Sequence, residues 1–293
     1  MPELPEVETV RRGLEATTCH RSIVGVEVLL ERSISSPASV SAFVSGLTGT
    51  AISGWHRRGK YLFAQLGTDP KLDRLQPNEG GWLAVHLRMT GQLLWCNAED
   101  PLPTHTRVRL WFDGDRELRF VDTRTFGRMW WVPPRVNPKA IVTALLSLGP
   151  EPFSNDFSTD YLVNTLSHRR KPIKTALLDQ GILAGVGNIY ADETLFLSRI
   201  HPLQLSCDLS WEDVDRLRHN LLHVLENAIA AGGTTLRDFR TVRGTNGNYG
   251  GQSWAYNREG QPCRACGTSI ERMKLSGRSS YFCPTCQPIP RKA

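Results

Sequence analysis

The stretch Cys263-Arg264-Ala265-Cys266, followed after sixteen residues by Cys283-Pro284-Thr285-Cys286, fixes the structure expected at the C-terminal end of the chain. Two Cys-x2-Cys pairs at this separation are typical of two turns that supply four thiolates to one tetrahedral Zn²⁺ ion. Because all four cysteines serve as ligands, such a site is closed and structural rather than catalytic. The sequence therefore predicts a zinc finger, with a pair of redox motifs as the alternative.

The residues between the two cysteine pairs have the pattern of a hairpin. Gly277 marks a turn, and apolar residues resume at Tyr281. We therefore expect two short strands with a basic, glycine-containing tip. Arg278 at this tip could present two aligned donors to a phosphate, and an ordinary surface arginine on a turn is the alternative.

Positive charge is concentrated at the same end of the chain. The 293 residues include 35 Lys and Arg against 29 Asp and Glu, a net charge of +6. Residues 230–293 hold ten basic and three acidic residues, which gives this end +7 and leaves −1 for residues 1–229. A dense basic segment indicates a polyanionic partner such as nucleic acid, and a solvated tail is the alternative.

Length and composition exclude several classes of protein. With 40% hydrophobic residues, the chain can bury the cores of two domains, which excludes a disordered polymer. Its apolar stretches, such as 140–148 and 221–229, are much shorter than the ~20 residues of a membrane-spanning helix. The acidic, proline-broken start of the chain lacks the basic and apolar segments of a secretory signal, so we expect a cytoplasmic protein.

Short apolar or alternating runs dominate residues 23–132 and predict a β-sandwich or a flattened barrel. Asp113-Gly114 lies between two such runs and indicates a hairpin. The proline-rich stretch 133–138 marks a domain boundary, after which 139–148 is predicted to be a helix.

Beyond that boundary the pattern is helical. Ser210 and Asp213 have the spacing of a capping box, and apolar residues then recur at helical spacing from Val214 to Ala228. Gly232-Gly233 would end this helix.

The amino terminus, Pro2-Glu3-Leu4-Pro5-Glu6-Val7-Glu8, has two interpretations. The first is an ordinary helix start, because proline suits the first turn and glutamates suit the positive end of the helix dipole. In the second, removal of Met1 exposes the secondary amine of Pro2, which can attack a sugar C1′ and form an iminium that favours elimination. Glu3, beside that amine, could then relay protons.

Three further clusters could act on nucleic acid or be ordinary structure. In 56–63, Gly59 precedes Lys60, which suits a proton donor, a phosphate clamp or a solvated strand edge. Met89 and Phe126 can wedge between bases, but both residue types commonly pack in cores. A glycine-rich turn leads into a helix near Asn188 and suits a phosphate better than a dinucleotide.

Together these segments resemble the bacterial formamidopyrimidine-DNA glycosylase family over nearly the whole chain. The segments that carry the resemblance are 2–8, 58–61, 86–91, 122–127, 148–152, 174–193 and 277–286. The resemblance implies an α+β fold with three parts: an N-terminal catalytic two-sheet β-sandwich over residues 1–135, a helix-two-turn-helix DNA-binding domain over 136–255 and a four-cysteine zinc finger over 256–290.

The same resemblance implies an enzyme of base-excision repair. It would act as a monomer on double-stranded DNA that contains an oxidised base or an abasic site. It would excise oxidised purines, chiefly 8-oxoguanine and formamidopyrimidines, and then cut the strand at the abasic site by β,δ-elimination.

Roles for single residues also follow from the resemblance. Pro2 would be the Schiff-base nucleophile and Glu3 the proton donor in base removal, while Lys60 and Arg278 would be the donors for β- and δ-elimination. The gap left by the flipped base would be filled by Met89, Arg124 and Phe126. Phosphates would be held by His105, Arg124, Arg169, Lys174 and Asn188. One structural Zn²⁺ ion would be bound by Cys263, Cys266, Cys283 and Cys286.

The sequence departs from the family pattern at a few places. Arg88 replaces the glycine that usually precedes Met89, and His168 occupies a position that is often Lys or Arg. The polar stretch 68–81 is longer than the usual connection and is expected to be a surface loop. Residues 237–252 would form the loop over the extruded base.

Two rival functions remain. The first is an endonuclease VIII-type enzyme, which acts on oxidised pyrimidines. Leu4 and Phe126 favour the purine enzyme over it. The second is a zinc-finger protein that binds DNA without catalysis, and the set Pro2, Glu3, Lys60 and Arg278 argues against it.

Overall fold

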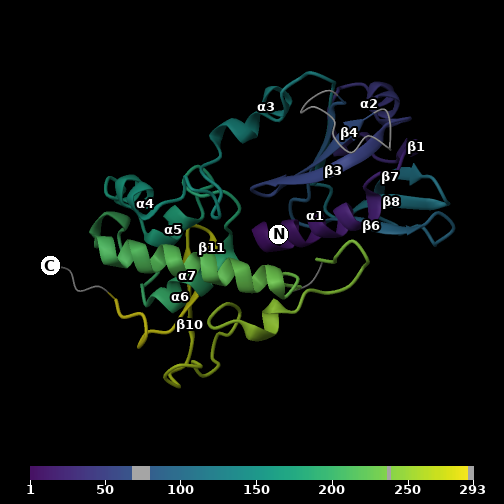
Figure 1. Ribbon diagram of the computed structural model, residues 1–293. Coiled ribbons are helices and arrows are strands. Elements are labelled where there is room, and N and C mark those ends of the chain that lie inside the picture. Colours follow the sequence, from purple (N-terminus) through teal and green to yellow (C-terminus); the bar gives the residue numbers. More distant parts are fainter. Residues whose placement is uncertain (68–79, 236–238, 290–293) are drawn as a thin grey trace. The chain divides into compact units, whose positions relative to one another are not determined.

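A computed structural model describes residues 1–67, 80–235 and 239–289 (Figure 1). The expected surface loop at 68–81 therefore lies almost wholly outside the described residues. Contacts between Cα atoms divide the chain into two compact units. The N-terminal unit comprises Met1–Leu146 and Gly232–Asn248, and the C-terminal unit comprises Ser147–Ala231 and Tyr249–Ala293.

Two β-sheets form the frame of the N-terminal unit, as the sequence predicted. The first sheet is antiparallel, and its strands in spatial order are β1 (Ile23–Val28), β7 (Thr106–Phe112), β8 (Arg116–Asp122) and β6 (Gly91–Asn97). The second sheet has the order β2 (Ile34–Ser36), β9 (Arg128–Val132), β5 (Trp82–His86), β4 (Tyr61–Gly67) and β3 (Ala51–Arg58).

The alternation of residue types explains how these strands pack. Along β7, Thr106, Val108, Leu110 and Phe112 are buried, and the residues between them are partly exposed. This period of two gives the strand one core face and one wetter face. The predicted hairpin at Asp113-Gly114 is confirmed, since it joins β7 to β8 with Gly114 at a φ of 74°.

Two helices complete the N-terminal core. Val7, Val10 and Leu14 of α1 (Leu4–Thr18) are buried, and α1 packs against β3 and β4. The second helix, α2 (Val40–Leu47), buries Phe43 and Leu47 in the same core. Both helices therefore contribute one apolar stripe to a core that they share with the strands.

The predicted helix over 139–148 was wrong as a single element. A short helix, α3 (Pro138–Ile141), is followed by a 3-10 turn over Thr143–Ser147. Between them Val142 has φ −93° and ψ 71°, which lies outside the α-helical region and interrupts the hydrogen-bond ladder.

The C-terminal unit is mainly helical, with a hairpin at its end. Its helices are α4 (Thr159–Leu166), α5 (Ile173–Leu177), α6 (Asn188–Ser198) and α7 (Trp211–Ala230). The strands β10 (Glu271–Leu275) and β11 (Arg278–Phe282) form the predicted hairpin between the cysteine pairs. The predicted mixed α+β class is confirmed. No helix of the described residues is long and apolar enough to cross a membrane.

The longest helix, α7, begins and ends as its sequence predicted. The Ser210 hydroxyl accepts a hydrogen bond from Asp213 N at 3.2 Å, and Ser210 N donates to the Asp213 carboxylate at 3.3 Å. This reciprocal pair satisfies two donors at the helix start. Gly232 and Gly233 then turn the chain with φ values of 75° and 79°, which glycine adopts without strain.

The chain that follows α7 returns to the N-terminal unit, although the sequence suggested that it belongs with the helices. Phe239 and Val242 are buried in the core of the N-terminal unit, and Trp95 N donates to Val242 O at 2.9 Å. Residues 237 and 238 of the predicted loop lie outside the described residues. The division into domains at 135 and 255 stays a prediction.

Candidate functional site

The amino end of α1 is held by a buried carboxylate. Glu3 N donates to Glu6 Oε2 at 2.8 Å, and Thr234 N donates to Glu6 Oε1 at 2.7 Å. Glu3 and Glu6 are 3% and 1% exposed, and Pro2 is also buried. Gly233 fits against Glu6 because a Cβ at this position would lie 2.9 Å from Glu6 Oε1. The N-terminal residues therefore have a fixed position in the N-terminal unit.

Lys60 lies in the tight turn between β3 and β4. Arg58 pairs with Tyr61 across this turn, and Gly59 between them has a φ of 56°. The Lys60 side chain is buried. Arg57 Nη1 donates to the carbonyl of Gly59 at 3.1 Å, which fixes the backbone directly before Lys60.

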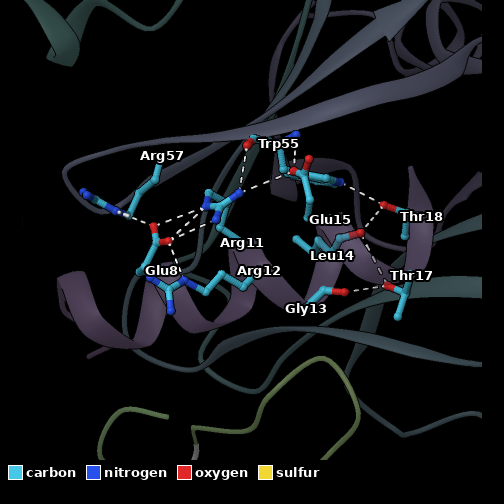
Figure 2. Close-up of polar contacts among 10 residues, drawn as sticks. All are labelled: Glu8, Arg11, Arg12, Gly13, Leu14, Glu15, Thr17, Thr18, Trp55 and Arg57. Atoms are coloured by element: carbon cyan, nitrogen blue, oxygen red, sulfur yellow. Dashed lines mark hydrogen bonds and ion pairs between the residues drawn. The ribbon is translucent and has the colours of Figure 1, made fainter. Parts of the chain in front are cut away.

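The same arginine ties this turn to α1 (Figure 2). Arg57 Nε lies 3.2 Å from Glu8 Oε2, and Glu8 also accepts hydrogen bonds from Arg11 and Arg12 of its own helix. Burial raises the pKa of Glu8, but the arginine contacts outweigh it and hold the pKa below its usual value. Glu8 is therefore a carboxylate that links α1, which begins directly after Glu3, to the turn that holds Lys60. We call the contacts among Glu8, Arg11, Arg12 and Arg57 the Glu8 network.

A neutral histidine stands beside the Lys60 turn. His86 of β5 pairs with Tyr61, and the two rings meet edge to face with centroids 4.4 Å apart. Its Nδ1 accepts a hydrogen bond from Arg88 N at 3.0 Å. Burial lowers the pKa of His86 to about 3, with further lowering by the charges of Arg88 and Lys60. His86 therefore adds no third positive charge there.

Two turns of the N-terminal unit bring Met89 and the 124–126 segment together. Thr90 Oγ1 donates to Asp122 at 2.5 Å and accepts from Arg124 N at 3.0 Å. Met89 and Phe126 remain 38% and 49% exposed, and the Arg124 guanidinium lies 4.9 Å from the centre of the Phe126 ring. Large apolar side chains exposed on adjoining turns are available for a partner.

Two neighbouring residues complete this surface. The carbonyl of His105 accepts a hydrogen bond from Asp122 N at 2.9 Å, so His105 borders the same turns, and its side chain is exposed. Arg88 has a φ of 53°, in the left-handed region that favours glycine. Its conformation explains why a glycine also fits at this position.

In the C-terminal unit, Lys174 and Asn188 both support the hairpin that carries Arg278. Lys174 Nζ and Asn188 Nδ2 donate to the carbonyl of Ser279 at 2.8 and 2.9 Å. Lys174 is also ion-paired with Asp192 at 2.7 Å, and the other Asp192 oxygen accepts from Tyr281 N at 3.1 Å. We call these contacts the Lys174 network. Arg278 itself is exposed at the start of β11.

Burial distinguishes this network from the surface sites that the sequence suggested. Lys174 and Asp192 are at most 1% exposed. Burial raises the pKa of Asp192 to about 7, against the opposing effect of Lys174. Because the ammonium of Lys174 is held by Asp192 and Ser279, its observed contacts position the hairpin. A direct phosphate contact by Lys174 stays a prediction.

Arg169 is half-buried in the same unit. Its Nε donates to the carbonyl of Thr165 at 3.1 Å, and Nη1 lies 3.8 Å from Asp179. The long distance to Asp179 indicates a weak ion pair. The predicted phosphate contact of Arg169 stays a prediction.

Sequence reasoning missed the structural roles of Asp192 and Glu193. Glu193 accepts hydrogen bonds from three successive backbone amides, Trp254 N, Ala255 N and Tyr256 N, at 2.7 to 3.0 Å. It therefore holds the chain that leads into the cysteine-rich segment. Two consecutive acids in a helix whose other residues are mostly apolar could have indicated buried partners.

The four predicted metal ligands lie together. The Sγ atoms of Cys263, Cys266, Cys283 and Cys286 all lie within 4.8 Å of one another. Sulfurs of Cys263 and Cys286 are 3.9 Å apart, and those of Cys266 and Cys283 are 3.5 Å apart. A tetrahedral Zn²⁺ with bonds of about 2.3 Å separates its sulfurs by about 3.8 Å, so this donor set fits zinc.

Family models match three successive parts of the chain. The model described as the formamidopyrimidine-DNA glycosylase N-terminal domain matches residues 1–129, and its H2TH domain model matches 148–240. A model described as a zinc finger found in FPG and IleRS matches residues 260–289. Together the three models cover every predicted site residue.

Two formamidopyrimidine-DNA glycosylases match nearly the whole chain. It is 55% identical over 287 residues to formamidopyrimidine-DNA glycosylase of a Nostoc species, covering 98% of this chain and 100% of the relative. It is 56% identical over 288 residues to the enzyme of the same name from Acaryochloris marina, covering 98% and 99%.

Solved structures of Lactococcus lactis Fpg have the same fold. Complexes with DNA containing an abasic site, Fapy-dG or an oxidized pyrimidine match this chain with TM-scores of 0.87, 0.85 and 0.86. Each is 32% identical and covers 98% of this chain and 100% of the matched chain.

Proposed function

Since the chain belongs to the formamidopyrimidine-DNA glycosylase family, we propose that it excises oxidised purines from double-stranded DNA and then cleaves the abasic site. One observation carries the proposal: the Glu8 network connects the helix that begins after Pro2 and Glu3 to the turn that holds Lys60. A nucleophile and a proton donor must keep a fixed separation for such chemistry. The proposed partner is DNA, the proposed state a monomer and the proposed location the bacterial cytoplasm.

The first proposed step forms a bond between enzyme and sugar. After removal of Met1, the lone pair of the Pro2 amine attacks C1′ of the damaged nucleotide. The C1′–N bond breaks, the base leaves with that electron pair, and Glu3 supplies its proton. The Pro2 nitrogen then loses its proton, and the C1′–O4′ bond opens as O4′ takes up a proton. The resulting iminium carries a positive charge that acidifies the C2′ proton.

Two eliminations follow in the proposed mechanism. Loss of the C2′ proton expels the 3′ phosphate in the β-elimination, for which Lys60 is the proposed donor. Loss of the C4′ proton then expels the 5′ phosphate in the δ-elimination, with Arg278 as the proposed donor. Water finally releases the sugar fragment from Pro2.

Binding of the duplex is assigned to exposed and half-buried residues of the two units. Met89, Arg124 and Phe126 would fill the space that the flipped base leaves, as their exposure on adjoining turns supports. His105, Arg124, Arg169 and Asn188 would contact phosphates. Lys174 would act mainly through the carbonyl of Ser279.

A structural Zn²⁺ is the proposed cofactor. Cys263, Cys266, Cys283 and Cys286 would hold it, and their clustered sulfurs support this assignment. Bound zinc would supply folding free energy to the segment around the β10–β11 hairpin. Replacing Cys283 with Ala should therefore release zinc and weaken DNA binding. Unchanged affinity with retained zinc would contradict this role.

Trapping with borohydride tests the proposed chemistry. The duplexes carry 8-oxoguanine, thymine glycol or no lesion, and reduction should give a covalent adduct at Pro2 with the 8-oxoguanine duplex. Pro2→Leu, whose bulk blocks removal of Met1, should abolish the adduct. Pro5→Ala, in the first turn of α1, is the matched control and should retain it. An adduct that survives in Pro2→Leu would refute the nucleophile.

The same assay separates the rival functions. A preference for thymine glycol would favour the endonuclease VIII-type alternative. The thymine glycol duplex is included because the Lactococcus lactis relative has been solved with DNA that contains an oxidized pyrimidine. Binding of all duplexes without any adduct would favour a non-catalytic DNA-binding protein.

A further inference from the structure

A basic recess lies in the N-terminal unit, apart from the residues assigned to catalysis. It has a volume of about 380 Å³ and is lined by Thr17, Arg21, Trp95, Arg116 and Arg243. Three of these five residues are arginines, and none is acidic. We call it the Trp95 recess.

The position of Thr17 separates this recess from the proposed chemistry. Thr17 is the penultimate residue of α1, whereas Pro2 precedes the first residue of that helix. A 15-residue helix is about 20 Å long, because each residue adds about 1.5 Å. A ligand of the Trp95 recess would therefore lie far from a sugar bound at Pro2.

The indole of Trp95 organises two of the arginines. The guanidinium carbons of Arg21 and Arg116 lie 5.6 and 5.1 Å from the centre of its ring. Such stacking fixes the plane of a guanidinium and leaves its edge available for hydrogen bonds. The third arginine is placed by its neighbour, since Val242 is buried and its carbonyl accepts from Trp95 N at 2.9 Å.

Carboxylates neutralise these arginines only weakly. Arg21 Nη1 lies 3.8 Å from Asp113, near the limit of an ion pair. Arg116 Nη1 donates to the neutral amide oxygen of Asn97 at 2.9 Å, and its Nε is buried without a hydrogen-bond partner among the described residues. In the described part of the chain, the exposed guanidinium of Arg243 has neither a hydrogen bond nor an ion pair.

Three guanidiniums around one recess repel one another, and an anion would relieve that repulsion. Their forked donors match the oxygens of a phosphate better than those of a spherical anion. We propose that the Trp95 recess is a phosphate-binding site, occupied by a free phosphate compound or by a phosphate of a DNA strand. Thr17 and Trp95 line the same recess.

Nuclear magnetic resonance on the full chain tests this site. The indole N–H resonance of Trp95 is assigned from its loss in Trp95→Phe. Pyrophosphate and a lesion-free ten-nucleotide single strand are titrated at constant ionic strength, with chloride as the reference anion. We expect a saturable shift of the Trp95 resonance that chloride does not produce.

Arginine variants decide whether the shift comes from the recess. Arg243→Gln, at an exposed position, should weaken binding by about tenfold, and Arg116→Gln should do so where it folds. Arg135→Gln removes an exposed arginine elsewhere in the same unit and should leave the affinity unchanged.

A shift of the Trp95 resonance with pyrophosphate identifies a free phosphate compound as a ligand, and a shift with the oligonucleotide alone identifies a DNA phosphate. No saturable shift, or equal weakening in Arg243→Gln and Arg135→Gln, overturns the proposal. Borohydride trapping at Pro2 reads the proposed catalysis separately.

Discussion

Lys60 and Arg278 both stand at the turns of two-stranded hairpins, but the two hairpins are held in opposite ways. The Lys60 turn depends on the Glu8 network, in which one carboxylate faces three arginines at partly exposed positions. The Arg278 hairpin depends on the Lys174 network, in which a buried Lys174–Asp192 ion pair and Asn188 contact a backbone carbonyl and amide.

The difference is one of redundancy. Glu8 keeps two arginine partners when one is removed, and water can reach the outer members of its network. Asp192 is fully buried, so water cannot replace the positive charge of Lys174 when that side chain is lost. The two hairpins should therefore respond very differently to single substitutions.

Replacing Lys174 with Met should have the largest effect. The substitution leaves Asp192 buried without its partner, which typically costs about 3–5 kcal/mol of unfolding free energy. Chemical denaturation measures the loss, and the yield of δ-elimination product should fall with it. In the double variant Lys174→Met/Asp192→Leu, much of the stability should return. A single variant within about 1 kcal/mol of the parent would show that the buried pair is not the support we infer.

Low pH should reduce the unfolding free energy of the unit that holds the Lys60 turn, because of His86. Its pKa in the folded state is about 3, whereas an unfolded histidine titrates near 6.5. The unfolded chain therefore binds the proton first, so stability is complete above about pH 6.5 and falls as the pH drops toward 3. The slope is at most about 1.4 kcal/mol per pH unit, or about 2–3 kcal/mol by pH 4.5.

A His86→Asn variant isolates this contribution. The amide oxygen can still accept from Arg88 N but does not titrate in this range. The difference in unfolding free energy between parent and variant should shrink or reverse between pH 6.5 and pH 4.5. A constant difference across that window would show that His86 takes up no extra proton on unfolding.

Glu8→Gln should have an intermediate effect on the partly exposed network. It removes the charge that three arginines share, and we expect a loss of about 1–2 kcal/mol with a several-fold slower β-elimination. Arg12→Gln is the matched control, because its side chain is 60% exposed and Arg11 and Arg57 remain. Its unfolding free energy should change by less than about 0.5 kcal/mol. Equal effects of the two variants would contradict the proposed link through Arg57.

Arg88→Gly should have the smallest effect. Glycine relieves the left-handed backbone at this position, worth about 1 kcal/mol, but the unfolded chain gains freedom that offsets much of it. We expect a change of a few tenths of a kcal/mol in unfolding free energy and retained strand cleavage. A loss of more than tenfold in cleavage would instead assign the Arg88 side chain a role on DNA.

Local patterns allowed much of the fold to be predicted. The capping residues of α7, the hairpin at Asp113-Gly114 and the paired cysteines are signals within a few residues of one another, and the structure has all three. The helix predicted over 139–148 failed because its apolar residues did not reveal the break at Val142.

The sequence predicted which residues belong to the candidate site, but it did not predict their burial or their contacts. The family resemblance gave Lys174 as a phosphate contact, and no pattern in the sequence revealed that it forms a buried ion pair with Asp192, eighteen positions away. Similarly, the hydrogen bond from Thr234 to Glu6 joins positions 228 apart. Contacts of this kind depend on tertiary packing, which no short pattern in one sequence specifies.

The return of residues 232–248 to the N-terminal unit has a consequence for synthesis on the ribosome. The strands and helices of residues 1–146 leave the ribosome first, but Phe239 and Val242 are needed to complete their core. At about 5–20 residues per second, the missing segment arrives roughly 5–20 s later. During that interval the core of the N-terminal unit lacks these two side chains, and the apolar surface that they cover stays open to water.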